Sequence, residues 1–431
     1  MAATAAGGAG NAGNASASVK PQIIGQGSYG VVIKPAFPNT NSTGKVHEYP
    51  ENVTKLFFKK SGYNQVLNVA SRLPGIFGPN NGHRIYPYSR SFTFKNLPMN
   101  LQSKFKSVDP NTKLYPVRMP NLGKSLNTLS TFYKELRVIP VRTILSQIQK
   151  LLHQLLNAKK EGYIHGDVRE TNIMINPATG IMTLIDFDFL HTVEDFLKMY
   201  PFGFYCHPPE TMILFHMKKR DVKLYFKTAD EYIKHINNSF GRFLTAYYQP
   251  KINWDLIEPI KDRTEDKIMA AADESDEIKN ILKTFDSFGL ALTMLEMLTW
   301  VYPGCTASDS PTTNKAAFVE GLRARLSAST ESVEKSADLI LQVVHSVLIP
   351  LSDFDYETRM TIDRAVELVD TILSTPASVD ESFVGGGGAT PSVTAVTVEA
   401  PVLPTKPNNA VKKKTRKRRA KRRAYNSSRK R

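Results

Sequence analysis

Two polar motifs constrain the fold of this chain more than any other feature. Residues 165–172 read His-Gly-Asp-Val-Arg-Glu-Thr-Asn, and residues 186–188 read Asp-Phe-Asp after a short predicted hairpin. On such a loop, Asp167 can accept a proton from a hydroxyl group, while Asn172 and Asp186 offer the hard oxygen ligands that Mg²⁺ prefers. Phosphoryl transfer depends mainly on positioning and charge neutralisation. The two motifs therefore predict a phosphoryl-transfer site.

A glycine-rich segment lies upstream of these motifs. Residues 23–32 read Ile-Ile-Gly-Gln-Gly-Ser-Tyr-Gly-Val-Val, with apolar residues on both sides, as a strand–turn–strand requires. Glycines let a backbone close over phosphates because no Cβ intervenes. A plain glycine-rich hairpin is the alternative. A dinucleotide-binding fingerprint would need a helix at the third glycine, whereas the β-branched residues 31–33 favour a strand.

A lysine stands in the next apolar pattern. Beyond a polar, turn-rich stretch from Pro35 to Pro50, residues 52–58 read Asn-Val-Thr-Lys-Leu-Phe-Phe. Burying the Lys55 ammonium without a partner would be costly. Because the glycine segment precedes Lys55, we favour contact of its ammonium with nucleotide phosphates over a solvent-facing position in an edge strand.

The order of these motifs resembles that of the protein-kinase superfamily. The matching residues are Gly25, Gly27, Gly30, Lys55, Asp167, Asn172 and Asp186. Residues 119–123 (Met-Pro-Asn-Leu-Gly), at the hinge position, and residues 30–35 (Gly-Val-Val-Ile-Lys-Pro) look like divergent serine/threonine kinase-like proteins of large DNA viruses. The similarity spans roughly residues 22–373.

This resemblance implies an α+β, bilobal protein-kinase-like fold with ATP in the cleft. A small β-rich N-lobe is expected over residues 20–120 and a larger helical C-lobe over residues 121–373, with a helical insertion at about 211–283. Disordered segments are expected outside this domain because their composition offers little to bury. They are a leader (1–19), a linker (374–411) and a basic tail (412–431).

The resemblance also implies a role for each motif residue. Asp167 would be the catalytic base, Arg169 a charge neutraliser and Lys55 the phosphate contact. Asn172 and Asp186 would bind Mg²⁺, with Mn²⁺ as the alternative ion. The residues expected to bind ATP are Gly25, Gln26, Gly27, Ser28, Tyr29, Gly30, Val32, Lys55 and Met119.

A charged pair separates protein kinases from small-molecule kinases that share a His-Gly-Asp loop. Glu210 ends a Pro-Pro-Glu run where the family closes its activation segment, and Arg359 falls where the family carries the arginine that pairs with that glutamate. A buried bidentate pair would clamp the segment to the helical lobe. Two ordinary surface charges are the alternative.

The chain departs from the family pattern near Lys55 and near residues 186–188, the predicted metal loop. No Asp or Glu lies between Lys55 and Asp109, so the usual helix glutamate is missing, and Gln65 or Asn68 offers only a neutral hydrogen bond. Lys55 must then be oriented by Asp186, by the nucleotide or by a carboxylate from elsewhere. Asp188 replaces a glycine, which removes conformational freedom.

Residues 165–172, the predicted catalytic loop, and the helix predicted behind them also differ from the family pattern. Gly166 replaces the arginine that receives an activation-loop phosphate in the family, so activity is expected not to depend on that phosphorylation. In the family, an aspartate at the start of the helix behind the loop braces the loop. Asp286 is displaced by two positions from that aspartate, at the start of an apolar helix through Leu298, and we assign it the same role.

The function expected from this pattern is ATP- and Mg²⁺-dependent phosphorylation of Ser or Thr in protein substrates, and the viral resemblance tilts the acceptor towards Ser/Thr. A pseudokinase scaffold is the main alternative, favoured by the missing helix acid and by Asp188. A small-molecule kinase is a weaker alternative, opposed by Glu210 and Arg359.

Charge is concentrated at the C-terminal end. The chain carries +16, of which thirteen positive charges lie in residues 412–431, so the preceding residues total only +3. Such a run binds phosphates by counterion release and is equally typical of nuclear targeting. Nucleic acid or another polyanion is therefore a predicted partner beside protein substrates, while the oligomeric state stays open.

Composition bounds the compartment. Two cysteines indicate no disulfide framework, and no apolar run reaches the length of a membrane span. We therefore expect an intracellular protein that is neither secreted nor membrane-bound. The viral resemblance and the basic tail imply the host cell nucleus or the virion.

Periodicity predicts the main elements. Residues 141–160 repeat apolar side chains at the 3.6-residue helical period. A second helix is predicted at 64–71. Strands are predicted at 22–34, 52–58, 114–119, 173–176 and 181–185.

Overall fold

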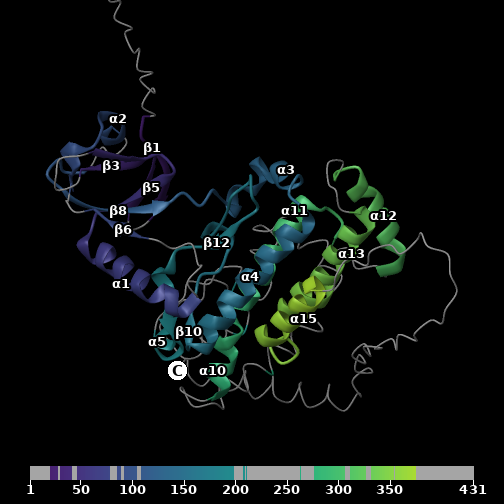
Figure 1. The fold of residues 1–431 in the computed structure, drawn as a ribbon. Helices are drawn as coiled ribbons and strands as arrows, with labels where there is room; N and C mark the ends of the chain where they lie inside the picture. The colour runs from purple at the N-terminus through teal and green to yellow at the C-terminus, as the bar shows by residue number, and fades with distance from the viewer. Residues whose placement is uncertain are drawn as a thin grey trace, which may run out of the picture. The chain divides into compact units, whose positions relative to one another are not determined.

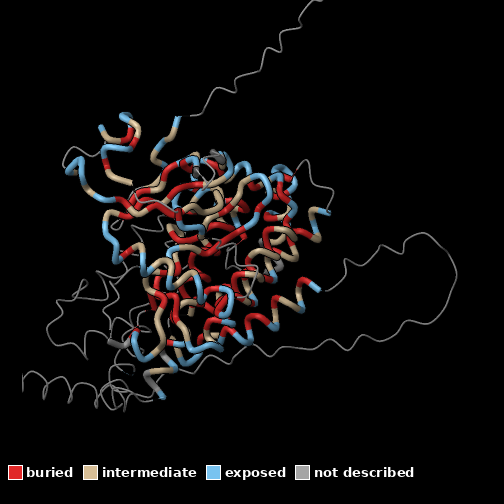
Figure 2. Tube along the Cα trace, turned by 60° about the vertical axis from the view of Figure 1, so that its left-hand side comes forward, coloured by how far each residue is buried: buried red, intermediate tan, exposed pale blue. Residues whose placement is uncertain are grey.

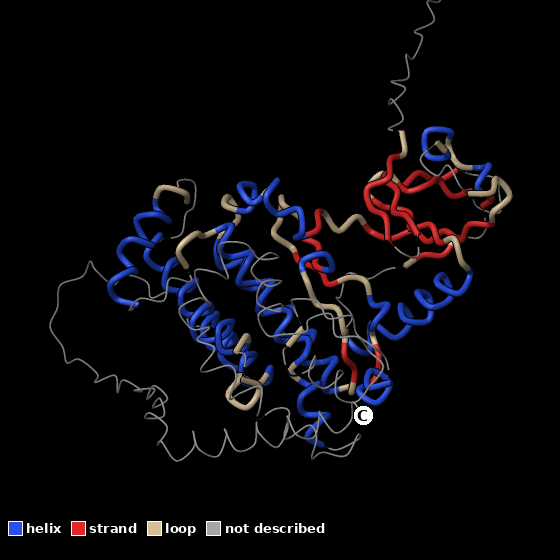
Figure 3. Tube along the Cα trace, turned by 180° about the vertical axis from the view of Figure 1, so that it is seen from behind, coloured by secondary structure: helices blue, strands red, loops and turns tan. Residues whose placement is uncertain are grey.

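The computed structural model has an α+β fold, as predicted. An N-terminal antiparallel sheet region is followed by a mostly helical part (Figure 1, Figure 3). The chain divides into two units, residues 1–377 and 378–431. The structure describes residues 20–27, 30–40, 46–77, 85–88, 92–103, 108–198, 207–208, 210, 263, 276–305, 311–326, 332–353 and 355–374.

The N-terminal region is built on a six-stranded antiparallel sheet. Its strand order is β1-β2-β5-β8-β6, and β7 also pairs with β8. The strands are β1 (Gln22–Gly27), β2 (Gly30–Lys34), β5 (Asn52–Phe57), β6 (Tyr86–Pro87), β7 (Phe92–Thr93) and β8 (Lys113–Pro120). Val31 and Ile33 alternate into a core shared with Leu56 and Leu114, as period-two strands require. The predicted strand region at 22–34 contains two strands, β1 and β2, and the strands predicted at 52–58 and 114–119 are confirmed as β5 and β8.

The stretch predicted to be turn-rich, residues 35–50, instead contains a hairpin of β3 (Ala36–Thr40) and β4 (Val46–Tyr49). The many polar residues of this stretch predicted turns, but Phe37 within it is buried. Thr54 Oγ1 accepts a hydrogen bond from Phe37 N at 2.9 Å, and Tyr88 Oη donates to Phe37 O at 2.7 Å. These contacts attach the hairpin to the sheet.

Helix α1 (Lys60–Phe77) extends the helix predicted at 64–71 in both directions. Its C-terminal residues Leu73, Ile76 and Phe77 are buried in the core of the helical part, so tertiary packing stabilises turns that local sequence does not favour. The helix contacts α4 and the metal-loop turn η4 (Phe187–Phe189).

Helix α4 (Val141–Lys160) confirms the predicted range, and it buries the periodic apolar side chains that predicted it. Helix α11 (Phe285–Val301) is buried on nearly all sides, so the two form the centre of the helical core (Figure 1, Figure 2). The other elements of this part are η2 (Leu126–Thr131), α3 (Tyr133–Leu136), α5 (Val193–Lys198), α10 (Asp276–Lys283), α12 (Pro311–Arg323), α13 (Val333–Val343), η5 (Val344–Leu348), α14 (Ile349–Leu351) and α15 (Ile362–Ser374). The N-terminal region also contains η1 (Phe94–Asn96) and α2 (Met99–Gln102), which lie between β7 and β8 in the chain.

Two small antiparallel sheets carry the loops that hold the motifs. The first is β12-β11-β9, and the second is the pair β10-β13. Their strands are β9 (Lys124–Ser125), β10 (Tyr163–Ile164), β11 (Ile173–Ile175), β12 (Met182–Leu184) and β13 (His191–Thr192). The predicted hairpin at 173–185 is confirmed. The His-Gly-Asp run therefore connects β10 to β11 through η3 (Glu170–Asn172), and the Asp-Phe-Asp run connects β12 to β13.

Several predicted segments lie outside the described residues. They are the leader (1–19), residues 375–411 of the linker, the basic tail (412–431) and most of the insertion at about 211–283. Within the insertion, Arg263 and α10 are described. Among the helices that the structure describes, none is long and apolar enough to cross a membrane.

Candidate active site

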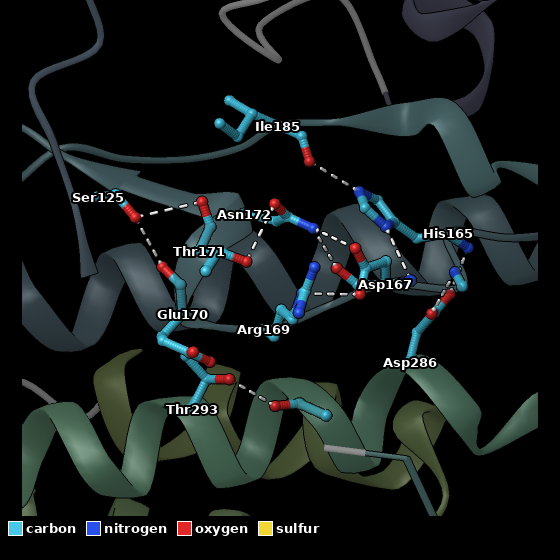
Figure 4. Close-up of polar contacts among 12 residues, drawn as sticks. Ser125, His165, Asp167, Arg169, Glu170, Thr171, Asn172, Ile185, Asp286 and Thr293 are labelled. Atoms are coloured by element: carbon cyan, nitrogen blue, oxygen red, sulfur yellow. Dashed lines mark hydrogen bonds and ion pairs between the residues drawn. The ribbon is translucent and has the colours of Figure 1, made fainter. Parts of the chain in front are cut away.

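The catalytic loop is braced from below by helix α11 (Figure 4). The Asp286 carboxylate, in the first turn of that helix, accepts hydrogen bonds from His165 N at 2.6 Å and Gly166 N at 2.9 Å. Burial raises the pKa of Asp286 to about 6, although both backbone hydrogen bonds oppose the shift. The displaced aspartate thus makes the contact that the sequence assigned to it.

Gly166 occupies a position in this loop that favours glycine. Its φ of +78° lies in the left-handed region that favours glycine. A Cβ at this position would stand 2.7 Å from Phe196 Cε2 and 3.0 Å from Phe189 O. A larger residue at this position would therefore be strained and would require its neighbours to shift.

Asp167 is buried at the centre of the loop. Asn172 Nδ2 donates to its Oδ2 at 2.7 Å and to its backbone oxygen at 2.9 Å, and Arg169 Nε lies 2.9 Å from its Oδ1. Burial raises the pKa of Asp167 above its ordinary value, while Arg169 and Asn172 oppose the shift. Of the three predicted residues on this loop, Asn172 and Arg169 therefore both contact Asp167 (Figure 4).

Two residues that the sequence did not single out, Ser125 and Glu296, lie near Glu170 of the loop. Ser125 Oγ donates to Glu170 O at 3.0 Å and to Thr171 O at 3.2 Å. Glu170 is turned towards α11 (Figure 4), where it lies near Glu296. Burial and the Glu170 charge raise the pKa of Glu296 to about 8. No local sequence signal distinguishes these groups, because their burial arises only from packing.

The metal loop begins at Asp186, which is exposed and has left-handed backbone angles, φ 64° and ψ 66°. The next residue, Phe187, is buried between His165 of the catalytic loop (ring centroids 4.8 Å apart) and Phe77 of α1 (5.1 Å). A continuous apolar contact therefore joins α1, the metal loop and the catalytic loop.

Asp188 follows and is half-buried. Burial and the charge of Asp186 raise the pKa of Asp188 to about 6, while Lys55 opposes the shift. On α1, Gln65 Nε2 donates to the backbone oxygen of Asp188 at 3.2 Å. Of the two neutral residues that the sequence offered on this helix, Gln65 is thus bonded to the metal loop.

Lys55 lies in the middle of the sheet. It pairs with Val32 of β2 on one side and Val117 of β8 on the other. Its Nζ stands 5.1 Å from the centroid of the Phe57 ring. The predicted nucleotide residue Val32 is therefore adjacent to Lys55 in the sheet.

The glycine segment forms the β1–β2 hairpin. Gly27 pairs with Gly30, and Gln26 pairs with Val31. A Cβ on Gly30 would stand 1.9 Å from Leu56 O, so close strand packing alone requires this glycine. Gly25 has no such contact below 3.7 Å. The loop residues Ser28 and Tyr29 lie outside the described residues.

Met119 lies near the end of β8, paired with Val53. The chain then leaves the sheet at Asn121, whose N donates to Glu51 O at 3.0 Å. Gly123 follows with φ +101°, and its Cβ would stand 2.2 Å from Ile175 O. The segment predicted as a hinge thus connects the sheet region to the helical part through a position that only glycine fits.

Glu210 and Arg359 form a buried ion pair. Arg359 donates to both carboxylate oxygens of Glu210, with the second bond, from Nη2 to Oε2, at 3.0 Å. The guanidinium also donates to Thr284 Oγ1 at 2.9 Å and to Asp353 O at 2.7 Å, and it lies over the Phe288 ring. The predicted partners therefore meet, and the pair is anchored to the start of α11.

The donor set fits Mg²⁺. Asn172 Nδ2 donates to Asp167, so its Oδ1 is the acceptor atom, and it accepts a hydrogen bond from Thr171 Oγ1 at 3.3 Å. Asp186 presents an exposed carboxylate. Mg²⁺ usually takes one or two protein ligands together with phosphate oxygens and water. In the described part of the chain, no three His, Cys, Asp or Glu side chains gather into a metal cluster, which such a shared site does not need.

Comparison with protein-family models and with curated proteins finds no match to this chain.

Proposed function

We propose that this chain is a protein kinase that transfers the γ-phosphoryl group of ATP to Ser or Thr of protein substrates. The observation that carries the proposal is the environment of Asp167. This carboxylate is buried, bonded to Asn172 and adjacent to the Arg169 guanidinium, on a loop held from behind by Asp286. A raised pKa makes Asp167 a better proton acceptor than an exposed carboxylate.

In the proposed reaction the acceptor hydroxyl oxygen attacks the γ-phosphorus. A new P–O bond forms, the bond between the γ-phosphorus and the ADP oxygen breaks, and the hydroxyl proton passes to Asp167. Arg169 neutralises charge that develops on the transferring group, and Lys55 contacts the nucleotide phosphates. Asn172 and Asp186 would bind Mg²⁺, which neutralises phosphate charge when bound.

Protein substrates are favoured over small molecules by the Glu210–Arg359 pair. It fastens residue 210, at the end of the segment that follows the metal loop, to the base of α11. In the family that this chain resembles, that segment lies at the peptide-binding surface. The choice of Ser or Thr as acceptor follows from the same resemblance.

A pseudokinase is the second candidate, and one observation favours it. Helix α1 carries no carboxylate, and its described polar contact with the metal loop is the neutral bond from Gln65 to Asp188 O. Retention of Lys55, Asp167, Asn172 and Asp186 together opposes this candidate, because a scaffold needs no catalytic base.

The deciding experiment compares Asp167→Asn with Asp186→Asn in an assay with labelled ATP, Mg²⁺ or Mn²⁺ and a generic basic protein. Removing a general base should lower turnover by about 10²–10⁴-fold and leave MgATP binding largely intact. Asp186→Asn should weaken metal-dependent ATP binding as well. Asp338→Asn, an exposed carboxylate paired with Lys315, is the control. Full turnover in both site variants would refute the assignment, and nucleotide binding without transfer in the wild type would favour the pseudokinase.

A further inference from the structure

The short turn η3 (Glu170–Asn172) carries one residue of the proposed site and follows another. Arg169 precedes the turn, and Asn172 is its last residue. The turn is closed by a hydrogen bond from Asn172 N to Arg169 O at 2.9 Å. Carbonyl groups at the end of a helical turn lack a partner within it and need a donor from outside. The positions of Arg169 and Asn172 therefore depend on what holds the carbonyls of Glu170 and Thr171.

One side chain from another part of the chain holds both carbonyls (Figure 4). Ser125 Oγ lies 3.0 Å from Glu170 O and 3.2 Å from Thr171 O. A serine hydroxyl has a single proton, so this proton is shared between the two acceptors. Replacing Ser125 with alanine would remove the donor of both carbonyls at once.

The backbone fixes the position of Ser125 independently of its hydroxyl. Ser125 pairs with Met174, and Lys124 pairs with Ile175, in the antiparallel ladder between β9 and β11. Gly123 allows the close approach of these segments, because a Cβ there would stand 2.2 Å from Ile175 O. The strand that directly follows the predicted hinge therefore presents the hydroxyl to the turn. A substitution of Ser125 can remove the hydroxyl and keep the backbone pairing.

A shift of η3 would reach the polar groups at the centre of the catalytic loop. Asn172 Nδ2 donates to Asp167 Oδ2 at 2.7 Å, and Thr171 Oγ1 donates to Asn172 Oδ1 at 3.3 Å. Arg169, just before the turn, has its Nε 2.9 Å from Asp167 Oδ1. Moving the turn would thus move the proposed metal ligand Asn172 and both partners of Asp167.

We propose that Ser125 is a positioning residue for Asn172 and Arg169, and that it couples the segment after the sheet to the metal site. This inference rests on the proposed function and deepens it. In this role Ser125 acts only through the backbone of the turn. Removal of a group that orients a metal ligand from behind typically costs about 10–100-fold in metal affinity or activity.

The test removes the hydroxyl in the full-length chain and then restores it. Ser125→Ala removes the donor, and Ser125→Cys keeps a side chain of similar size with only a weak donor. Both variants should lower kcat and weaken Mg²⁺-dependent binding of ATP, each by about 10–100-fold. Binding of ATP without a metal ion should stay close to that of the wild type. Ser125→Thr keeps the hydroxyl on a residue that suits a strand, and it should restore most of both losses.

Thr131→Ala is the matched control. Thr131 also carries a hydroxyl that donates to a backbone oxygen, that of Thr128 at 2.7 Å, but it is exposed and its described bond stays within η2. This variant should match the wild type in kcat and in its dependence on Mg²⁺. Thermal unfolding of every variant is measured in parallel, because it separates a loss of stability from a loss of positioning.

The outcomes separate this inference from the proposed function. Wild-type kcat and Mg²⁺-dependent ATP affinity in Ser125→Ala would overturn the inference alone, whatever the unfolding temperature. Equal losses in Ser125→Ala and Ser125→Thr would overturn it too, because the hydroxyl would then contribute nothing. A chain that binds MgATP without transferring phosphate would contradict the proposed kinase, and the affinity of Ser125→Ala for MgATP would still test the inference. A chain that binds no ATP would overturn both.

Discussion

At the scale of single residues, burial rather than residue type sets the chemistry of this site. Asp167, Asp286 and Glu296 are ordinary carboxylic acids in sequence, yet burial raises the pKa of each. In Asp167 the effect favours proton acceptance. Glu296 is not one of the predicted site residues, and its raised pKa affects the stability of the fold instead.

Glu296→Gln should stabilise the protein, and the gain should grow with pH. The pKa of Glu296 is about 8 in the folded state and 4.5 in the unfolded state. Between pH 4.5 and pH 8, Glu296 is therefore protonated in the folded state and ionised in the unfolded state. Stability contributed by this group is thus full below the unfolded pKa and is lost as pH rises towards 8. At about 1.4 kcal/mol per pKa unit, the cost at pH 8 amounts to a few kcal/mol.

The measurement is denaturant unfolding of both proteins at pH 5.5 and pH 8.5. The difference in unfolding free energy between variant and wild type isolates Glu296 from other titrating groups. Glu367→Gln, at an exposed side chain, is the control. An equal difference at the two pH values would contradict the assignment of a buried, neutral glutamic acid.

At the scale of elements, a few polar contacts between distant segments hold the site on its scaffold. The Asp286 carboxylate ties α11 to the catalytic loop, and Gln65 ties α1 to the metal loop. The Glu210–Arg359 pair performs the same task for the segment after the metal loop. Of these contacts, the ion pair is the most deeply buried.

Arg359→Ala should destabilise the fold by about 3–5 kcal/mol, because it leaves the buried Glu210 carboxylate without its cation. Thr284 Oγ1 and Asp353 O would lose their donor as well. Thermal or denaturant unfolding measures the effect. Arg364→Ala, which removes an exposed ion pair with Glu367, should change stability little. Similar losses of unfolding free energy in the two arginine variants would show that the buried ion pair stabilises the fold no more than the exposed one.

At the scale of the whole molecule, charge is divided unevenly along the chain. Residues 412–431 carry thirteen positive charges and no acid, while the remainder totals +3. Long-range attraction to polyanions therefore belongs to the tail, which suits nucleic-acid contact, nuclear targeting or both.

Deleting residues 412–431 should abolish most binding to DNA or RNA and spare turnover on a short neutral peptide. Binding of the intact chain should be insensitive to sequence and should weaken with salt, at a log–log slope of about 0.9 per phosphate contact on duplex DNA. An electrophoretic shift assay across a salt series, on intact and truncated protein, measures both. Unchanged affinity after truncation would place the contact in the preceding residues.

Sequence alone determined the features that depend on neighbours along the chain. The helical period of residues 141–160 predicted α4 because seven apolar side chains recur on one face. Asp167 and Asn172 stand five residues apart on one loop, so their contact follows from local spacing. The β-branched and apolar residues at positions 31–33 and 52–58 likewise predicted β2 and β5, since such residues favour strands.

Only the tertiary structure decided which distant groups meet. Asp286 and Gly166 are 120 residues apart, and Gln65 and Asp188 are 123 apart. The hairpin in residues 35–50 depended on a pocket for Phe37 that no local pattern reveals. Spacing along the chain encodes turns and faces, whereas such long-range contacts and the burial that shifts a pKa arise only when whole elements pack together.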